Sequence, residues 1–158
     1  MAEPLADKVM REIPQASDLY HRLVMLVVPA GAGKTAALQD VHARTSAPLI
    51  NVNLELSRRM LDLTERQRAL QLPRLLSEIV GAAETEVVLL DNIEVVFDIS
   101  LKQDPLRLLQ GLSRNKTVVA AWSGSVDGEN MVYATPDHPE YRRYPVRDFL
   151  VVHPKTIA

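Results

Sequence analysis

The sequence predicts an α/β fold in which a five-stranded, mainly parallel sheet carries helices on both faces. Short runs of consecutive apolar residues alternate along the chain with segments whose apolar residues recur at helical spacing. The apolar runs are continuous, as expected of parallel strands that are covered on both faces. With 158 residues, 47% of them hydrophobic, the chain is long enough for a real core, and we expect a single domain over residues 1–158.

The predicted strands follow the apolar runs, and helices occupy the segments between them. Strands are expected at 23–28, 49–54, 87–90, 118–122 and 148–152. Helices are expected at 5–13, 34–44, 58–80, 105–112 and 138–144. The first helix is expected to end before Pro14, because the residue before a proline avoids the helical conformation.

Capping signals mark the later helices. Thr64 and Gln67 form a capping box, and Pro73 is expected to kink or divide the helix, so that residues 58–80 form two pieces. Asp104 is the predicted N-cap of the next helix, with proline at its first position. The stretch 123–139, with its Gly, Ser, Asp and Pro residues, is predicted to be a mobile loop.

A turn of small residues joins the first predicted strand to its helix. Residues 28–35 read Val-Pro-Ala-Gly-Ala-Gly-Lys-Thr, and a strand leading into a turn that ends Gly-Lys-Thr is typical of a phosphate-binding P-loop, or Walker A motif. Small residues let backbone N–H groups surround phosphate oxygens, and the helix adds its positive N-terminal end. The motif has glycine at its first position, where this chain has Val28. The expected nucleotide-binding residues are Pro29, Ala30, Gly31, Ala32, Gly33, Lys34, Thr35 and Ala36.

An aspartate follows the third apolar run. Four apolar residues and then Asp91 form a Walker B motif, and the carboxyl ends of strands are where an open α/β sheet binds its ligand. We expect Lys34 to bind the β- and γ-phosphates, while Thr35 and Asp91 hold Mg²⁺, Asp91 directly or through water. The two motifs together predict ATP and Mg²⁺ as cofactors of a three-layer P-loop NTPase fold.

The residue after Asp91 bears on how fast ATP is hydrolysed. Many P-loop ATPases have glutamate there as the base that activates water, whereas this chain has Asn92. An amide orients water but does not take its proton, so we expect slow or partner-stimulated hydrolysis. Glu94, close in sequence, and Glu55, at the end of the second predicted strand, are alternative bases. A solvated surface carboxylate is the more ordinary interpretation of each.

Two further side chains have a functional and a structural interpretation. Ser123 follows the fourth predicted strand, where it could contact the γ-phosphate or the attacking water, or simply belong to a Ser-Gly turn. Tyr20 could stack on adenine, although packing in the core is the favoured interpretation.

The order of the motifs resembles the core of AAA+ and related P-loop ATPases over nearly the whole chain. This resemblance implies a γ-phosphate sensor at Ser123 and an arginine finger at Arg142 or Arg143, which precede the fifth predicted strand. It also implies a homo-oligomer bridged by ATP or ADP. Solvated surface arginines are the alternative, and no helical lid is expected after the fifth strand.

Five segments look more specifically like the BrxF family, small P-loop proteins of type III BREX (bacteriophage exclusion) systems. The segments are Val28–Thr35, Asn53–Ser57, Leu90–Glu94, Asp104–Leu109 and Ala121–Gly124. The resemblance implies a role in bacterial antiphage defence beside other BREX proteins.

Composition narrows the remaining functions. The absence of cysteine excludes disulfides, thiol catalysis and cysteine-ligated metal, and the four histidines are scattered. The net charge of −2 gives no overall basic field, so DNA contact is not indicated, although a local basic patch stays open. No apolar run approaches the ~20 residues of a membrane span, and we expect a cytoplasmic protein.

Three functions stay open at this point. The first is a compact ATPase or ATP-dependent switch, favoured by the Walker B motif and Ser123. The second is a small-molecule kinase, for which Arg58 and Arg59 after the second predicted strand are the relevant residues. The third is a nucleotide-binding interaction module without turnover, which Asn92 makes credible.

Overall fold

The structure, a computed structural model, describes residues 4–29 and 31–154. Its α-helices are α1 (Leu5–Ala16), α2 (Lys34–Thr45), α3 (Val52–Met60), α4 (Glu65–Gly81) and α5 (Pro105–Leu112), with 3-10 helices η1 (Glu94–Phe97) and η2 (Ile99–Leu101). Its strands are β1 (Leu23–Val28), β2 (Leu49–Asn51), β3 (Val87–Asp91), β4 (Thr117–Asp127), β5 (Asn130–Tyr133), β6 (Arg142–Pro145) and β7 (Leu150–Val152). Strands β2-β3-β4-β1-β7 lie side by side in that order, all parallel. The mixed α/β class with a mainly parallel sheet is therefore as predicted, and the arrangement is that of a Rossmann-like or P-loop-like fold.

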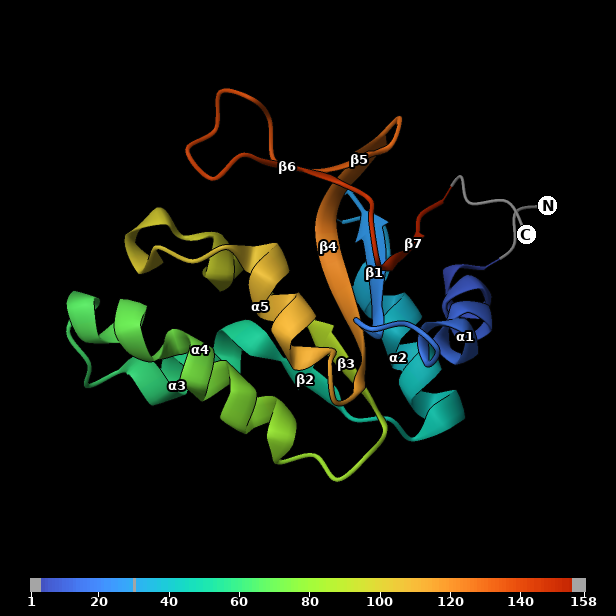
Figure 1. Cartoon of the computed structure of the whole chain (residues 1–158), viewed down its shortest axis with the longest axis horizontal. Coiled ribbons are helices and arrows are strands. Elements are labelled where there is room, and N and C mark those ends of the chain that lie inside the picture. The colour runs from blue at the N-terminus through green and yellow to red at the C-terminus, as the bar shows by residue number, and fades with distance from the viewer. Residues whose placement is uncertain (1–3, 30, 155–158) are drawn as a thin grey trace.

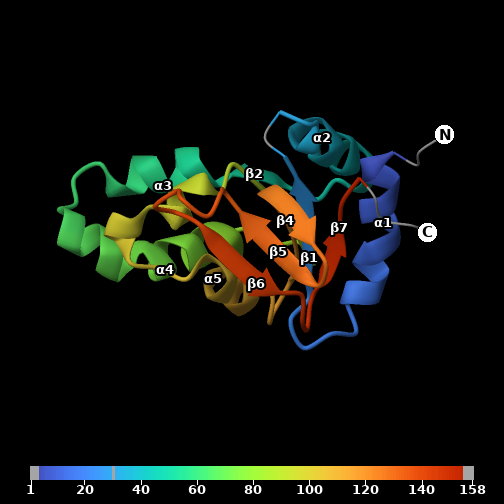
Figure 2. The same ribbon diagram turned by 90° about the horizontal axis from the view of Figure 1, so that it is seen from above.

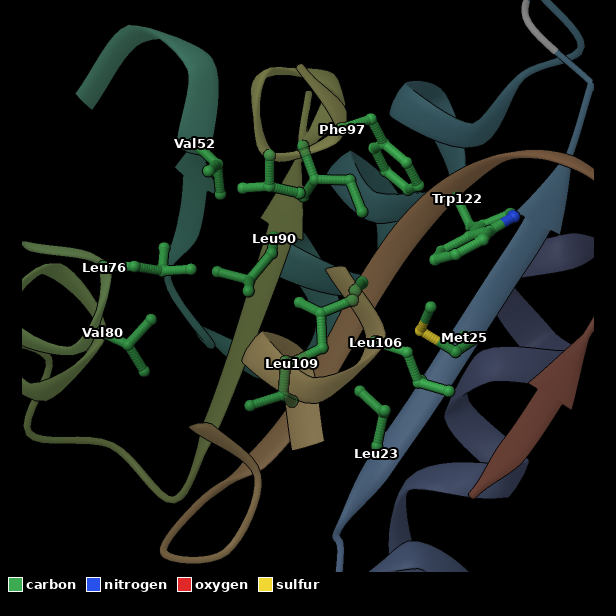
Figure 3. Close-up of a cluster of buried hydrophobic side chains, with 14 of the residues drawn as sticks. Leu23, Met25, Val52, Leu76, Val80, Leu90, Phe97, Leu106, Leu109 and Trp122 are labelled. Atoms are coloured by element: carbon green, nitrogen blue, oxygen red, sulfur yellow. The ribbon is translucent and has the colours of Figure 1, made fainter. Parts of the chain in front are cut away.

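Helices cover both faces of the parallel sheet (Figure 1). Every residue of β1 is buried, because alternate side chains point into two separate cores. Leu23, Met25 and Val27 pack on the side of α3, α4 and α5, where Leu90 and Trp122 join them (Figure 3). Val24, Leu26 and Val28 pack on the side of α1 and α2. Burial on both faces explains why the strand is a continuous apolar run.

The strand order brings the two predicted motifs to one edge of the sheet. Strand β4 lies between β1, which leads into the P-loop, and β3, which ends at Asp91. Val28 is in register with Ser123, and Asn51 with Asp91. Because all these strands are parallel, their carboxyl ends meet at the same edge.

A three-stranded antiparallel extension was not predicted, so the sheet has seven strands rather than five. Strand β4 continues from the expected 118–122 to Asp127, then pairs with β5, which pairs with β6. Part of the predicted mobile loop 123–139 is therefore a hairpin above the parallel sheet (Figures 1 and 2). The Trp122 indole N–H donates to the Val132 carbonyl oxygen at 3.1 Å and helps to hold it. This pairing is not apparent from local sequence, because Gly, Ser and Asp residues are also typical of loops.

Two elements differ in type from their predictions. The second strand ends at Asn51 instead of residue 54, because the Asn51 side chain accepts from the Leu54 N–H and opens α3. The predicted helix at 138–144 is wrong, since strand β6 begins at Arg142 and pairs with β5. A local cap decides the first place, and pairing of distant strands decides the second.

Helix boundaries agree best with the sequence where side chains cap them. The Thr64–Gln67 capping box is present in full at the start of α4, and Asp104 caps α5 as predicted. The prolines predicted the ends of helices less well. Helix α1 continues past Pro14 to Ala16, and α4 continues through Pro73, so the break in 58–80 falls before Thr64 instead. A proline removes one helical hydrogen bond. In each helix, packing of the apolar face against its own core outweighs that loss.

Candidate functional site

The P-loop turn is built on two glycines in the left-handed conformation. Gly31 has φ 80° and Gly33 has φ 96°, values that residues with a side chain avoid. A Cβ atom on either glycine would meet nothing within 4 Å, so the backbone conformation, not space, requires glycine there. The Ala32 N–H donates to the Pro29 carbonyl oxygen at 3.1 Å and closes the turn. Ala30 lies outside the described residues.

The turn ends at the N-terminus of α2, with Gly33 as its N-cap. No side chain caps this end, and the first turn of α2 has no acidic residue. The first intrahelical donor is the Ala37 N–H, which bonds the Gly33 carbonyl at 3.0 Å. The N–H groups of Lys34, Thr35 and Ala36 precede that bond, so they stay available to an anion at the positive end of the helix.

Lys34 lies at the first position of α2 and is buried, with 9% of its surface exposed. Lys34 is therefore not an exposed loop lysine. The ammonium has no hydrogen-bond or ion-pair partner within residues 4–29 and 31–154. An anionic ligand would give this ammonium a partner.

Thr35 and Asp91 are adjacent across the sheet edge, although 56 residues separate them in sequence. The Thr35 hydroxyl donates to Asp91 Oδ2 at 2.6 Å. Asp91 Oδ1 accepts from the Asn92 N–H at 2.9 Å, and Asp91 is only 3% exposed. The two residues that the sequence assigned to Mg²⁺ are therefore in direct contact.

These residues fit the chemistry of Mg²⁺. Mg²⁺ prefers hard oxygen ligands and commonly takes one or two from protein, with phosphate oxygens and water supplying the others. Asp91 is a buried carboxylate, and its described donors are both neutral, so a cation would complete its environment. The described part of the chain has no cluster of three or more His, Cys, Asp or Glu side chains suited to a metal.

The backbone conformation at position 92 gives a structural reason for asparagine there. Its φ is 53°, in the left-handed region that asparagine tolerates better than glutamate. Its carbonyl oxygen accepts from the Asn53 N–H at 2.9 Å. The backbone at this position therefore disfavours the glutamate that many P-loop ATPases have there.

Glu94 is partly buried at the start of η1, and its Oε2 has no hydrogen-bond partner among the described residues. Its negative charge, after burial and the charge of Glu140, contributes to raising the pKa of Tyr133 to about 12. Glu94 therefore lies on the side of the β4–β5 hairpin and is not the solvated surface carboxylate of the ordinary interpretation.

Ser123 lies beside the end of β1, in register with Val28. It has the parity of Val119 and Ala121, which pack on the α2 side of the sheet. Asp91 shares that parity with Leu89 on β3. Ser123 and Asp91 thus face the side of the sheet on which α2 begins.

The two candidate arginine fingers are held within the chain. Arg142 donates from Nη2 to the Gln103 carbonyl oxygen at 3.0 Å, on the α5 side of the molecule. Arg143 pairs with Asp127 at 3.1 Å across the hairpin and has a side chain that is 43% exposed. Arg143 is therefore the more accessible of the two.

Two other candidate residues, Glu55 and Tyr20, lie in settings that differ from the predicted ones. Glu55 is on α3 rather than at a strand end, and it pairs with Arg58 at 3.5 Å and Arg59 at 3.3 Å. Tyr20 is 70% exposed, so its expected packing in the core is wrong. The Arg114 guanidinium lies over its ring, 5.2 Å from the centroid.

Comparisons with known proteins add little. No family model matches the chain, and no curated protein matches it. One solved structure to which the chain is similar is that of C. elegans PCH-2, with 15% sequence identity and a TM-score of 0.40. The match covers 94% of this chain and 39% of the PCH-2 chain, so this chain spans well under half the length of that protein.

Helix length and polarity bear on the membrane prediction. Within the described residues, none of the helices combines the length and apolar character that a bilayer crossing demands.

Proposed function

We propose that this protein is an ATP-binding P-loop domain that hydrolyses ATP slowly in isolation. The observation that carries the proposal is the 2.6 Å contact between the Thr35 hydroxyl and the Asp91 carboxylate, beside an uncapped helix N-terminus. Each feature alone is common, but a phosphate-binding turn and a buried carboxylate at one sheet edge are what a Mg²⁺–nucleotide requires.

The chain's own residues then have distinct tasks. Backbone N–H groups at Lys34, Thr35 and Ala36 bind phosphate oxygens, and the Lys34 ammonium neutralises phosphate charge. Asp91 and Thr35 hold Mg²⁺, which would neutralise charge on the phosphates when bound. Ser123 faces the same side of the sheet, and this supports a role in orienting the terminal phosphate or a water molecule.

ATP binding measured by titration calorimetry with and without Mg²⁺ tests the site. Lys34→Ala should lose most ATP affinity, with circular dichroism to verify folding because the side chain is buried. Thr35→Val should lose the Mg²⁺ enhancement of binding, whereas Thr35→Ser, which keeps the hydroxyl, should retain it. Normal Mg²⁺–ATP affinity in both Lys34→Ala and Thr35→Val would contradict the assignment.

A module that binds ATP without turnover is the second candidate, because Asn92 supplies no base and is held in a conformation unsuited to glutamate. Phosphate release measured without any acceptor, with and without DNA, separates the candidates. Slow release supports the ATPase or switch, and no release supports the module. Formation of ADP that needs an added small-molecule acceptor and is not accompanied by phosphate release supports a kinase, because the phosphoryl group is then on the acceptor. Arg58 and Arg59, the residues relevant to a kinase, are both paired with Glu55 on α3.

The resemblance to the BrxF family leads to a finer proposal, that the domain acts in antiphage defence with other BREX proteins. It is supported by the five sequence segments alone. Plaque counts on bacteria that carry the complete defence system, with either the wild-type chain or Lys34→Ala, test it. Equal protection by both would contradict a nucleotide-dependent role in defence.

A further inference from the structure

Asn53, the second residue of α3, joins that helix to the turn after Asp91. Its backbone N–H donates to the Asn92 carbonyl oxygen at 2.9 Å. Its side-chain Oδ1 accepts from the Val95 N–H at 2.8 Å, across 42 residues of sequence. The two bonds hold the turn at Asn92 and again at Val95. The sequence predicted no role for Asn53, because its side chain bonds the backbone N–H of Val95 on a distant segment.

The same turn orients the Asp91 carboxylate. The Asn92 N–H donates to Asp91 Oδ1 at 2.9 Å, while Thr35 donates to Oδ2 at 2.6 Å. Asn92 directs its N–H there from a left-handed conformation with φ 53°. Such a conformation persists where the surrounding structure holds it, and Asn53 is what bonds the carbonyl of this residue. A continuous series of hydrogen bonds thus connects Asn53 with Asn92, Asp91 and Thr35.

We propose that Asn53 is a positioning residue of the nucleotide site. Its side-chain amide holds the Asp91–Val95 turn, and the turn keeps the Asp91 carboxylate aimed at Thr35 and at a bound Mg²⁺–nucleotide. The inference rests on the proposed function, because Asp91 and Thr35 are the residues assigned to Mg²⁺. Asn53 acts through Asp91 and does not contact the nucleotide.

A residue that supports a metal ligand through hydrogen bonds has a measurable effect on metal affinity. Removing such an outer partner typically costs 10–100-fold in metal affinity or activity. A merely structural role would instead lower the melting temperature and leave the Mg²⁺ dependence unchanged. The two roles can be separated because Asn51, two residues earlier, offers a matched control. The Asn51 side chain accepts from the Leu54 N–H at 3.1 Å and caps the same helix.

The first measurement is the Mg²⁺ concentration that half-maximally enhances ATP binding, obtained by titration calorimetry. Asn53→Ala should raise that concentration by roughly 10-fold or more. Asn53→Asp keeps an acceptor oxygen for the Val95 N–H, so it should stay at or below the wild-type concentration. Asn51→Ala likewise loses one side-chain hydrogen bond, the cap of α3, but should keep the wild-type Mg²⁺ dependence.

The second measurement needs no variant, so it holds even where Asn53→Ala fails to fold. If the Asn53–Val95 bond favours Mg²⁺–ATP binding, then Mg²⁺–ATP must favour that bond, because linkage is reciprocal. Amide hydrogen exchange followed residue by residue by NMR should show slower exchange at Val95 when Mg²⁺–ATP is added. The Leu54 amide, bonded to Asn51, should exchange at an unchanged rate.

The outcomes distinguish this proposal from the proposed function. An equal Mg²⁺ dependence in Asn53→Ala and Asn51→Ala, or a Val95 amide that does not respond to Mg²⁺–ATP, overturns the positioning role and leaves the nucleotide site in place. A wild-type protein that does not bind Mg²⁺–ATP at all overturns both.

Discussion

At the scale of single residues, backbone conformation explains several choices that side-chain chemistry does not. Gly33 has φ 96°, whereas Gly81 at the end of α4 has no positive φ, and neither has an atom near its absent Cβ. Gly33→Ala should therefore lower the free energy of unfolding by about 1–2 kcal/mol. Gly81→Ala is the control and should leave it unchanged or raise it slightly. Urea denaturation measures both, and equal effects of the two substitutions would contradict the strained-turn account.

Asn92 combines a backbone requirement with a chemical one. Asn92→Glu should raise the rate of ATP hydrolysis, because a carboxylate replaces an amide that does not take a proton from water. It should also cost about 1 kcal/mol of stability at φ 53°. Phosphate release per folded protein, with stability from urea denaturation, checks both effects. Asn92→Gly is the control, with little loss of stability and no gain in rate, and a Glu variant no faster than wild type would contradict our account of the base.

At the scale of elements, the β4–β5 hairpin depends on one close approach. A Cβ on Gly124 would lie 1.9 Å from the Val132 carbonyl oxygen, which also accepts from the Trp122 indole. Gly124→Ala should lower the free energy of unfolding by about 3 kcal/mol, because the strands must separate. Ser125→Ala, at the next, exposed position, should have little effect.

The protein contains one tryptophan, so the fluorescence of Trp122 follows this hairpin directly. Gly124→Ala should change the emission of the folded state as well as the denaturation midpoint. A variant with wild-type emission and stability would mean that the hairpin tolerates a methyl group and is not closely paired at Gly124.

Tyr133, on strand β5 of the same hairpin, makes the free energy of unfolding fall at high pH. Burial, followed by the charges of Glu140 and Glu94, raises the pKa of Tyr133 from 10.0 to about 12. Because the pKa is higher in the folded state, the full stability is present below pH 10 and is lost as the pH rises toward 12. The loss should reach at most about 1.4 kcal/mol per pH unit in that window. Burial and the hydrogen bond to Asp104 also raise the pKa of Tyr144.

Urea denaturation between pH 9 and pH 11.5 measures this dependence. Tyr133→Phe keeps the stack on Phe97, whose ring centroid lies 3.6 Å away, but removes the titrating hydroxyl. Its stability should fall less steeply with pH than that of the wild type, with the remaining slope due to Tyr144. Identical slopes would show that Tyr133 does not carry the effect.

At the scale of the whole molecule, we predict that ATP promotes assembly of copies of this chain. Arg143 is the more accessible candidate finger, and a finger supplied by a neighbouring subunit contributes roughly 10³-fold or more to turnover. The rate of hydrolysis per subunit should therefore rise with protein concentration. A non-hydrolysable ATP analogue should increase light scattering, because a ligand that binds the oligomer more tightly favours it.

Arg143→Ala should abolish this dependence on concentration, whereas Arg142→Ala should first disturb the contact with Gln103 and reduce stability. A strict monomer under all conditions, with a rate that does not depend on concentration, would contradict assembly. A separate partner would then be the source of the arginine.

The features of this protein that depend on short stretches of chain could be predicted from the sequence. Buried strands appear as continuous apolar runs, helix caps at Thr64 and Asp104 act over three residues, and the Gly-Lys-Thr turn precedes a helix as expected. The alternation of strands and helices then leads to a parallel sheet. These features follow from local conformational preference and from burial on both faces.

Contacts between distant segments follow only from the folded structure. It brought Thr35 to Asp91, joined Asn53 to Val95, buried Lys34 and paired β6 with β5 where a helix was expected. Hydrogen bonds such as these link groups 42 or 56 residues apart, so no local pattern records them. The residue types of a nucleotide site are thus visible in the chain, whereas the orientation of its carboxylate exists only once the sheet edge has formed.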